Sequence, residues 1–175
     1  MTTESASDVK KYYGKYRGTV INNVDPLQIG RIQALVPDVS GAFPTSWAMP
    51  CLPISGINTG VFALPQIGAG VWIEFEQGDP DSPIWVGGYW GITAEIPALA
   101  HTVPPGVPGV TVQTTTLNGI VVNDTPGVGG VTVYCRGIPM ISVTDVGIVI
   151  MNGKGAVLSM LGPVVDINAG ALTVV

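Results

Sequence analysis

The chain has 175 residues, of which 46% are hydrophobic and only 11% are charged, and its formal net charge is −5. This acidity argues against sequence-independent binding to nucleic acid, which depends on Lys and Arg side chains that neutralise phosphates. No apolar run approaches the roughly 18 residues of a membrane-spanning helix, and the high hydrophobic share excludes a disordered chain. The polar start, residues 1–8, lacks the apolar segment of a secretion signal, so we expect assembly in the cytoplasm.

A basic cluster precedes the first predicted strand. A short cluster of this kind is typically a solvated segment, and its functional interpretation is a docking arm for an acidic partner. The cluster contains most of the Lys and Arg residues of the chain: Lys10, Lys11, Lys15 and Arg17.

Strand patterns follow between residues 16 and 90. Residues 16–24 and 31–36 form two predicted strands around an Asp-Pro and Gly turn, and residues 70–78 and 84–90 form two more. In the third strand the alternation places Val71, Ile73 and Phe75 on one face and Trp72, Glu74 and Glu76 on the other. About five strands with one longer connection and bulge-like glycines fit a small Greek-key barrel of the oligonucleotide/oligosaccharide-binding (OB) type.

The last third of the chain has a different pattern. Residues 96–109 are rich in proline, which predicts a stiff linker. Beyond it, Val, Ile, Gly and Thr form short runs separated by turns, which predicts eight strands: 110–114, 119–123, 131–135, 141–145, 147–151, 156–160, 164–168 and 172–175.

This region carries too few charges to coat the surface of an isolated domain, because only five charged side chains follow Glu95: Asp124, Arg136, Asp145, Lys154 and Asp166. Strands this short cannot close a core in one chain of this length. Three copies wound together could do so, with Val, Ile and Leu side chains pointing inward.

No arrangement of residues indicates catalysis or metal binding. The carboxylates Glu74, Glu76, Asp79 and Asp81 have the spacing of an outward strand face and a turn, and the single histidine, His101, lies in the linker. The two cysteines, Cys51 and Cys135, are too far apart in sequence for a metal knuckle, and we expect both to be buried free thiols. The sequence therefore predicts no active site, cofactor or metal.

A set of linked motifs resembles a known family. The resemblance covers about residues 12–91, and each motif alone would be weak. The motifs are Asp25-Pro26 with Gly30-Arg31-Ile32, Ser46-Trp47-Ala48, Leu64-Pro65 with Gly68 and Val71, and Gly78-Asp79-Pro80-Asp81 with Pro83-Ile84-Trp85. Together they resemble the OB domain of contractile-injection spikes, namely phage baseplate assembly protein V and the type VI secretion spikes of the valine-glycine repeat family.

The resemblance implies an all-β protein, an OB barrel followed by an intertwined homotrimeric β-helix, and a non-enzymatic role. The implied divisions are residues 1–14 as a docking arm, 15–95 as the barrel, 96–109 as the linker and 110–175 as the spike. A spike of this family belongs to a phage tail or related particle and pierces the target cell envelope. Neither an inserted lysozyme domain nor a His-x-His metal apex, which some members carry, is expected here.

Two partners are implied as well. Because only about 15 residues precede the barrel, we expect a separate hub protein, docked through Lys10, Lys11, Lys15 and Arg17. The apolar end of the chain favours a separate tip protein, such as one of the proline-alanine-alanine-arginine repeat family, docked through Leu172, Val174 and Val175. The alternative function is an OB module that binds single-stranded nucleic acid or glycans through its aromatic residues.

Overall fold

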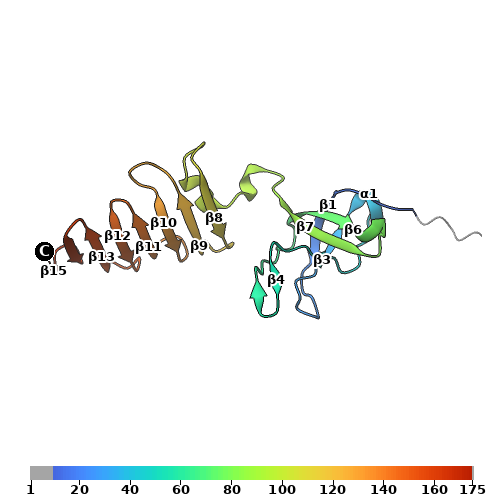
Figure 1. Ribbon diagram of the computed structural model, residues 1–175, viewed down its shortest axis with the longest axis horizontal. Coiled ribbons are helices and arrows are strands. Elements are labelled where there is room, and N and C mark those ends of the chain that lie inside the picture. The colour runs from blue at the N-terminus through green and yellow to red at the C-terminus, as the bar shows by residue number, and fades with distance from the viewer. Residues whose placement is uncertain (1–9, 175) are drawn as a thin grey trace, which may run out of the picture. The chain divides into compact units, whose positions relative to one another are not determined.

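The computed structural model describes residues 10–174 and confirms an all-β protein (Figure 1). The chain divides into two units, one ending at Thr93 and the other beginning at Ala94. Within residues 10–174, the helical segments are one four-residue α-helix and three 3₁₀ turns: α1 (Pro37–Ser40), η1 (Glu76–Gly78), η2 (Thr93–Glu95) and η3 (Ala98–Thr102).

The first unit contains a five-stranded sheet in the order β2-β1-β6-β7-β3. Its pairs are antiparallel except for β3 with β7, which is parallel. Isolated bridges from Ile32 to Ala48 and from Leu35 to Pro44 join the two edges of the sheet and close it into a barrel. The strands are β1 (Tyr16–Asn22), β2 (Gln33–Leu35), β3 (Met49–Pro50), β6 (Gly70–Phe75) and β7 (Pro83–Tyr89).

The barrel has a core of its own, and the alternation predicted for β6 identifies which side chains of that strand face the core. Val71, Ile73 and Phe75 are buried, whereas Trp72 and Glu74 between them are partly exposed. Gly18 of β1 lies so close to this core that an added Cβ would stand 3.1 Å from Ile73. The core consists of Val20, Ile32, Ala34, Val36, Ala48, Val71, Ile73, Phe75 and Trp85.

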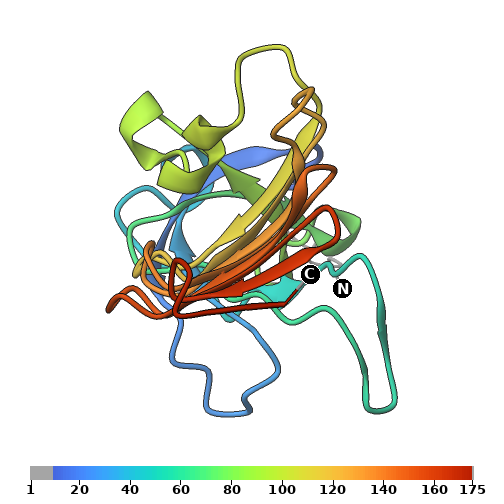
Figure 2. The ribbon, with the colours of Figure 1, turned by 90° about the vertical axis from the view of Figure 1, so that its left-hand side faces the viewer.

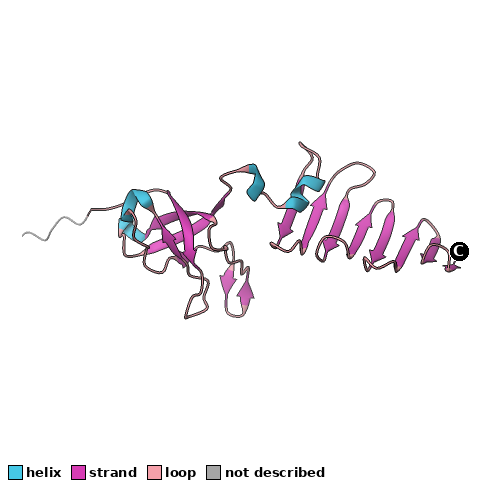
Figure 3. Cartoon of the chain, turned by 180° about the vertical axis from the view of Figure 1, so that it is seen from behind, coloured by secondary structure: helices cyan, strands magenta, loops and turns pink. Residues whose placement is uncertain are grey.

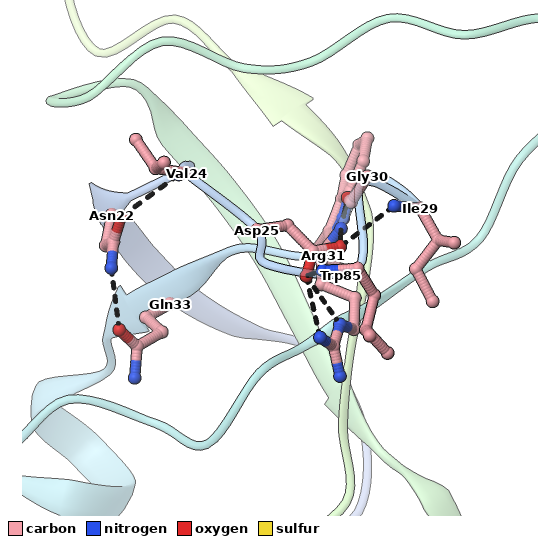
Figure 4. Close-up of polar contacts among 9 residues, drawn as sticks. Asn22, Val24, Asp25, Ile29, Gly30, Arg31, Gln33 and Trp85 are labelled. Atoms are coloured by element: carbon pink, nitrogen blue, oxygen red, sulfur yellow. Dashed lines mark hydrogen bonds and ion pairs between the residues drawn. The ribbon is translucent and has the colours of Figure 1, made fainter.

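The loop between β1 and β2 is organised around the buried carboxylate of Asp25 (Figure 4). Oδ2 accepts the backbone N–H groups of Ile29 at 3.0 Å and Arg31 at 3.2 Å, and Oδ1 accepts that of Leu27 at 3.0 Å. The Arg31 guanidinium donates to Oδ1 through Nε at 3.0 Å and Nη2 at 2.6 Å. One side chain thus fixes the whole loop.

The same loop is tied to the barrel by two aromatic residues. The Trp85 indole N–H donates to the Gly30 carbonyl at 3.0 Å, and the Arg31 guanidinium lies 5.5 Å from the centre of the Trp47 ring. The motif residues Asp25, Gly30, Arg31, Trp47 and Trp85 therefore form one cluster that joins the loop to β3 and β7.

A two-stranded hairpin, β4 (Ser55–Gly56) with β5 (Thr59–Gly60), projects from the barrel between β3 and β6. Figure 2 shows this hairpin and the β1–β2 loop extending from the same side of the barrel. The sequence did not predict this hairpin, because its strands are too short to give an alternating pattern.

The second unit is an eight-stranded antiparallel sheet in strict sequence order, in which each strand pairs with the next (Figure 3). The 3₁₀ turn η3, within the proline-rich stretch, contacts β8 and β9. The strands are β8 (Gly109–Gln113), β9 (Gly119–Asn123), β10 (Gly130–Tyr134), β11 (Met140–Thr144), β12 (Gly147–Met151), β13 (Val157–Leu161), β14 (Val164–Ile167) and β15 (Leu172–Val174).

The expectation that both cysteines are buried was wrong, since Cys51 and Cys135 are free and exposed. Cys51 follows the short strand β3, and its backbone N–H continues the pairing by donating to the Trp85 carbonyl. Cys135 lies just beyond the end of β10. In both places the polypeptide leaves a strand, so the side chain has no opposing layer to cover it.

Replacing Asp25 tests the loop anchor. The Arg31 hydrogen bond and the backbone N–H donors hold the pKa of Asp25 well below its usual range, against the opposing effect of desolvation. The ionised carboxylate therefore stabilises the barrel above the unfolded pKa of about 4, and this contribution is lost as pH falls toward the folded pKa. We expect Asp25→Asn to lower the barrel's melting temperature at pH 7 and to flatten its dependence on pH below about 4.

Tryptophan fluorescence is the suitable measurement, because all four tryptophans lie in the first unit. Asp38→Asn, at an exposed residue of α1, is the matched control and should leave the transition unchanged. Equal melting curves for the two variants would contradict the anchoring role of Asp25.

Candidate functional site

Two unbroken rows of apolar side chains cross the C-terminal sheet on one face, here called the apolar face. Side chains alternate between faces along a strand, so the strand register determines which residues share a row. One row runs through Val110, Val122, Val131, Val143, Ile148, Met160, Val165 and Val174, and the other through Val112, Ile120, Val133, Ile141, Ile150, Leu158, Ile167 and Leu172.

Most of these side chains remain exposed in the single chain, and Val112, for example, is 65% exposed. A monomeric soluble protein rarely exposes a contiguous apolar patch of this extent, and such patches mark interaction sites. Each Val, Ile or Leu that becomes fully buried contributes about 1.5–3 kcal/mol. Burying both rows would therefore yield tens of kcal/mol before conformational entropy is subtracted.

The opposite face has a mixed composition and is partly covered by the chain itself. Its central row contains Thr111, Val121, Thr132, Ser142, Val149, Ser159 and Asp166. Thr132 and Ser142 hydrogen-bond across strands at 3.1 Å. At the start of the sheet Leu99 of η3 is buried and lies over Gly119, beside the buried Val121, and its N–H donates to Gln113 Oε1 at 2.7 Å. The segment η3 thus covers the start of the mixed face, at β8 and β9, and leaves the apolar face open.

Asparagine side chains fix several turns at the edges of this sheet. Asn118 Oδ1 accepts the Arg136 N–H at 3.1 Å, Asn152 Oδ1 accepts the Lys154 N–H at 2.8 Å, and Asn168 Oδ1 accepts the Val157 N–H at 2.9 Å. Side-chain carbonyls that bind backbone N–H groups make turns specific, because they satisfy donors that no strand partner can reach. These three contacts therefore fix the register that builds the apolar rows at one end of the strands, where β8 turns into β9, β12 into β13 and β14 into β15.

The four basic residues predicted as a docking arm do not form a free positive patch. Lys15 pairs with Glu74, and the Arg17 guanidinium lies 5.6 Å from the Trp72 ring centre and 5.4 Å from that of Tyr89. Lys10 lies 4.9 Å from the Tyr12 ring centre, and Lys11 is exposed. The sequence did not predict the cluster of Arg17, Trp72 and Tyr89. These residues lie on three separate strands, β1, β6 and β7, which pair as the barrel fold requires.

The predicted tip residues lie at the far edge of the sheet in β15. Leu172 and Val174 are exposed there, and Val175 lies outside the described residues. The strand β15 pairs only with β14, so its other edge carries no strand partner within residues 10–174.

Two of the four carboxylates considered for catalysis, Glu74 and Asp79, have structural partners. Glu74 pairs with Lys15, and Asp79 Oδ1 accepts the Asp81 N–H at 3.1 Å within the turn after η1. In the described part of the chain, no three His, Cys, Asp or Glu side chains lie close enough together to hold a metal ion. The helices of that part are also too short to cross a membrane.

Comparison with known protein families gives two matches. Residues 16–90 match the type VI secretion system/phage-baseplate injector OB domain, and residues 109–173 match the phage baseplate V C-terminal trimerisation domain. A search of curated proteins finds no match. The fold and both matches define a structural component of contractile injection machinery. The chain belongs to the phage baseplate V family of injector spikes, and it forms a homotrimer through its C-terminal domain.

Two neighbouring residues of β11 test which face forms the trimer. Ile141→Asp places a charge on the apolar face, and Ser142→Asp places the same charge on the opposite face. An unpaired buried charge costs several kcal/mol, and a trimer would contain three of them. We expect Ile141→Asp to reduce the native mass from three chains to one and Ser142→Asp to leave it unchanged, as measured by light scattering. Loss of the trimer in the Ser142→Asp variant alone would assign the interface to the other face.

Proposed function

We propose that the chain forms the central spike of a contractile injection particle, a phage tail or a related secreted machine, and pierces the target cell envelope. The observation that carries the proposal is the pair of apolar rows on a sheet that follows an injector OB domain. Three such sheets, wound together with their rows toward a shared threefold axis, would form a narrow dry prism. Assembly in the cytoplasm precedes incorporation into the particle.

Mechanical stiffness is the property that such a spike needs, and the second unit has the features that provide it. Every strand from β9 to β14 is paired on both sides, and winding three chains together removes lateral edges. Apolar burial on this scale gives slow unfolding, which resists force during contraction. The role is structural, and both matched families are structural components.

The N-terminal side of the barrel is the proposed site for a separate hub protein. Lys10 and Lys11 are both exposed at the start of the described residues, so they offer the best contact for an acidic hub surface. Lys15 and Arg17 would contribute less, because Glu74 and the two aromatic rings already bind them.

The alternative of a nucleic-acid or glycan module has no specific support. The Trp72 and Tyr89 rings pack together with centroids 5.0 Å apart and Arg17 against both. Stacking of bases or sugars requires open ring faces, whereas these two rings pack on one another and on Arg17.

Incorporation into particles tests the spike and hub proposals together. We expect sedimented contractile particles from producer cells to contain three copies of an epitope-tagged chain, located at the baseplate by immunogold electron microscopy. A Lys10→Glu/Lys11→Glu variant should remain a trimer and incorporate at reduced level, because charge reversal opposes an acidic hub. Lys154→Glu, at an exposed position of the second unit, is the control and should incorporate normally. Absence of the wild-type chain from the particles would refute the spike role.

A separate tip protein is the second proposed partner, bound through Leu172, Val174 and Val175. Exposed apolar side chains at an unpaired strand edge favour a cap. We expect Val174→Asp to abolish co-purification with a conical tip protein of the proline-alanine-alanine-arginine repeat family. The trimer should persist, because Val174 is the last residue of its apolar row and a charge there can reach solvent, unlike a charge at Ile141 in the middle of the sheet. Val146→Asp is a matched control, since Val146 is 58% exposed and Val174 is 57% exposed. Equal retention of the tip protein by both variants would show that the cap, if present, binds elsewhere.

A further inference from the structure

A second apolar surface lies on the barrel, where the β1–β2 loop and the β4–β5 hairpin extend from one side as two prongs (Figure 2). Ile57 at the hairpin tip is 95% exposed and Val24 in the loop is 76% exposed. The only charged side chain in residues 23–30 is the buried Asp25, and residues 51–67 contain none. The prominent apolar side chains of these apolar prongs are Val24, Leu27, Ile29, Ile54, Ile57 and Phe62.

The prongs are held in place by hydrogen bonds and close contacts. Asp25 fixes the first, and the Asn23 side-chain amide donates to the Pro65 carbonyl at 2.9 Å, which joins the base of one prong to the base of the other. The Phe62 ring packs so closely on the first loop that a Cβ added at Gly30 would lie 3.2 Å from it. Apolar side chains displayed on fixed loops lose little conformational entropy when they bind, so this surface has the properties of an interface.

The connection to the trimerisation domain identifies the occupant. Only residues 94–97 separate the first unit from η3, which packs on β8 and β9, and four residues span at most about 15 Å. Each trimer therefore tethers three barrels at the millimolar effective concentrations typical of short linkers. An uncharged apolar surface needs an equally apolar partner, and two further copies of the prongs lie within reach of this tether.

We propose that the apolar prongs of each barrel pack against the prongs of the neighbouring copies, so that the barrels form a second interface around the same threefold axis. The inference rests on the homotrimer and is independent of envelope piercing. It assigns a role to the hairpin, which contributes nothing to the barrel core. The basic segment ahead of β1 then remains available to a hub.

Thiol labelling in the full-length chain tests this interface. In a Cys51→Ser/Cys135→Ser background, Ile57→Cys places one thiol at the hairpin tip, and Asp38→Cys, at an exposed residue of α1, gives the matched control. Each maleimide labelling rate is normalised to the rate of the same variant in denaturant. We expect the Ile57→Cys thiol to react at least about tenfold more slowly than the control thiol. Tenfold protection corresponds to about 1.4 kcal/mol of contact free energy. Adding Leu27→Asp to the other prong should restore the control rate.

Light scattering and tryptophan fluorescence on the same samples confirm the trimer and the folded barrel. Equal labelling of the two thiols in an intact trimer would overturn the inference and leave the hub as the occupant of the prongs. Protection that persists with Leu27→Asp would also overturn it, because another surface would then cover the hairpin. A monomeric mass would reject the homotrimer itself, which distinguishes the failure of the trimer from the failure of this interface.

Discussion

A complete apolar sheet face that one chain cannot cover is the constraint on which the rest of the structure depends. In the second unit each strand pairs with the next, so the backbone is satisfied, but the side chains of both apolar rows stay exposed. Among the described residues, the 3₁₀ turn η3 packs on this sheet at β8 and β9 and covers the start of the mixed face. Within residues 10–174 no segment covers the apolar rows, and the trimerisation domain of the family supplies two further chains that can bury them.

The barrel buries its apolar side chains in a different way. Its sheet closes through bridges at Ile32 and Leu35, so its apolar residues face one another and form a core within a single chain. The unit that must fold alone therefore carries most of the charge, the four tryptophans and the anchored loop. The unit that must assemble carries few charges and a periodic sequence.

The family motifs of the barrel act as one structural device. Asp25 accepts three backbone N–H groups and the Arg31 guanidinium, Trp47 packs on Arg31, and Trp85 donates to Gly30. These contacts hold the β1–β2 loop against β3 and β7 and give the prongs a fixed base. The family motifs therefore hold the shape of the barrel and its loop, and the interaction surfaces lie beside these motifs.

The sequence by itself determined the elements whose patterns are local. The alternation of Val71, Ile73 and Phe75 predicted the buried face of β6, and the turn residues between short Val and Ile runs predicted all eight strands of the tail. The scarcity of charge predicted burial by other chains, since that argument needs composition alone. The linked motifs identified the family because each of them is a short pattern of neighbouring residues.

The tertiary structure decided what depends on register and on contacts between distant residues. The apolar rows exist only because Val122 pairs with Val131 and Ile141 with Ile150, and a shift of one residue would turn those side chains to the opposite face. The pairing of Lys15 with Glu74, the packing of Arg17 on Trp72 and the exposure of Cys51 likewise depend on strand neighbours far apart in sequence. A linear pattern specifies the faces of each strand, but the sheet determines which faces come together.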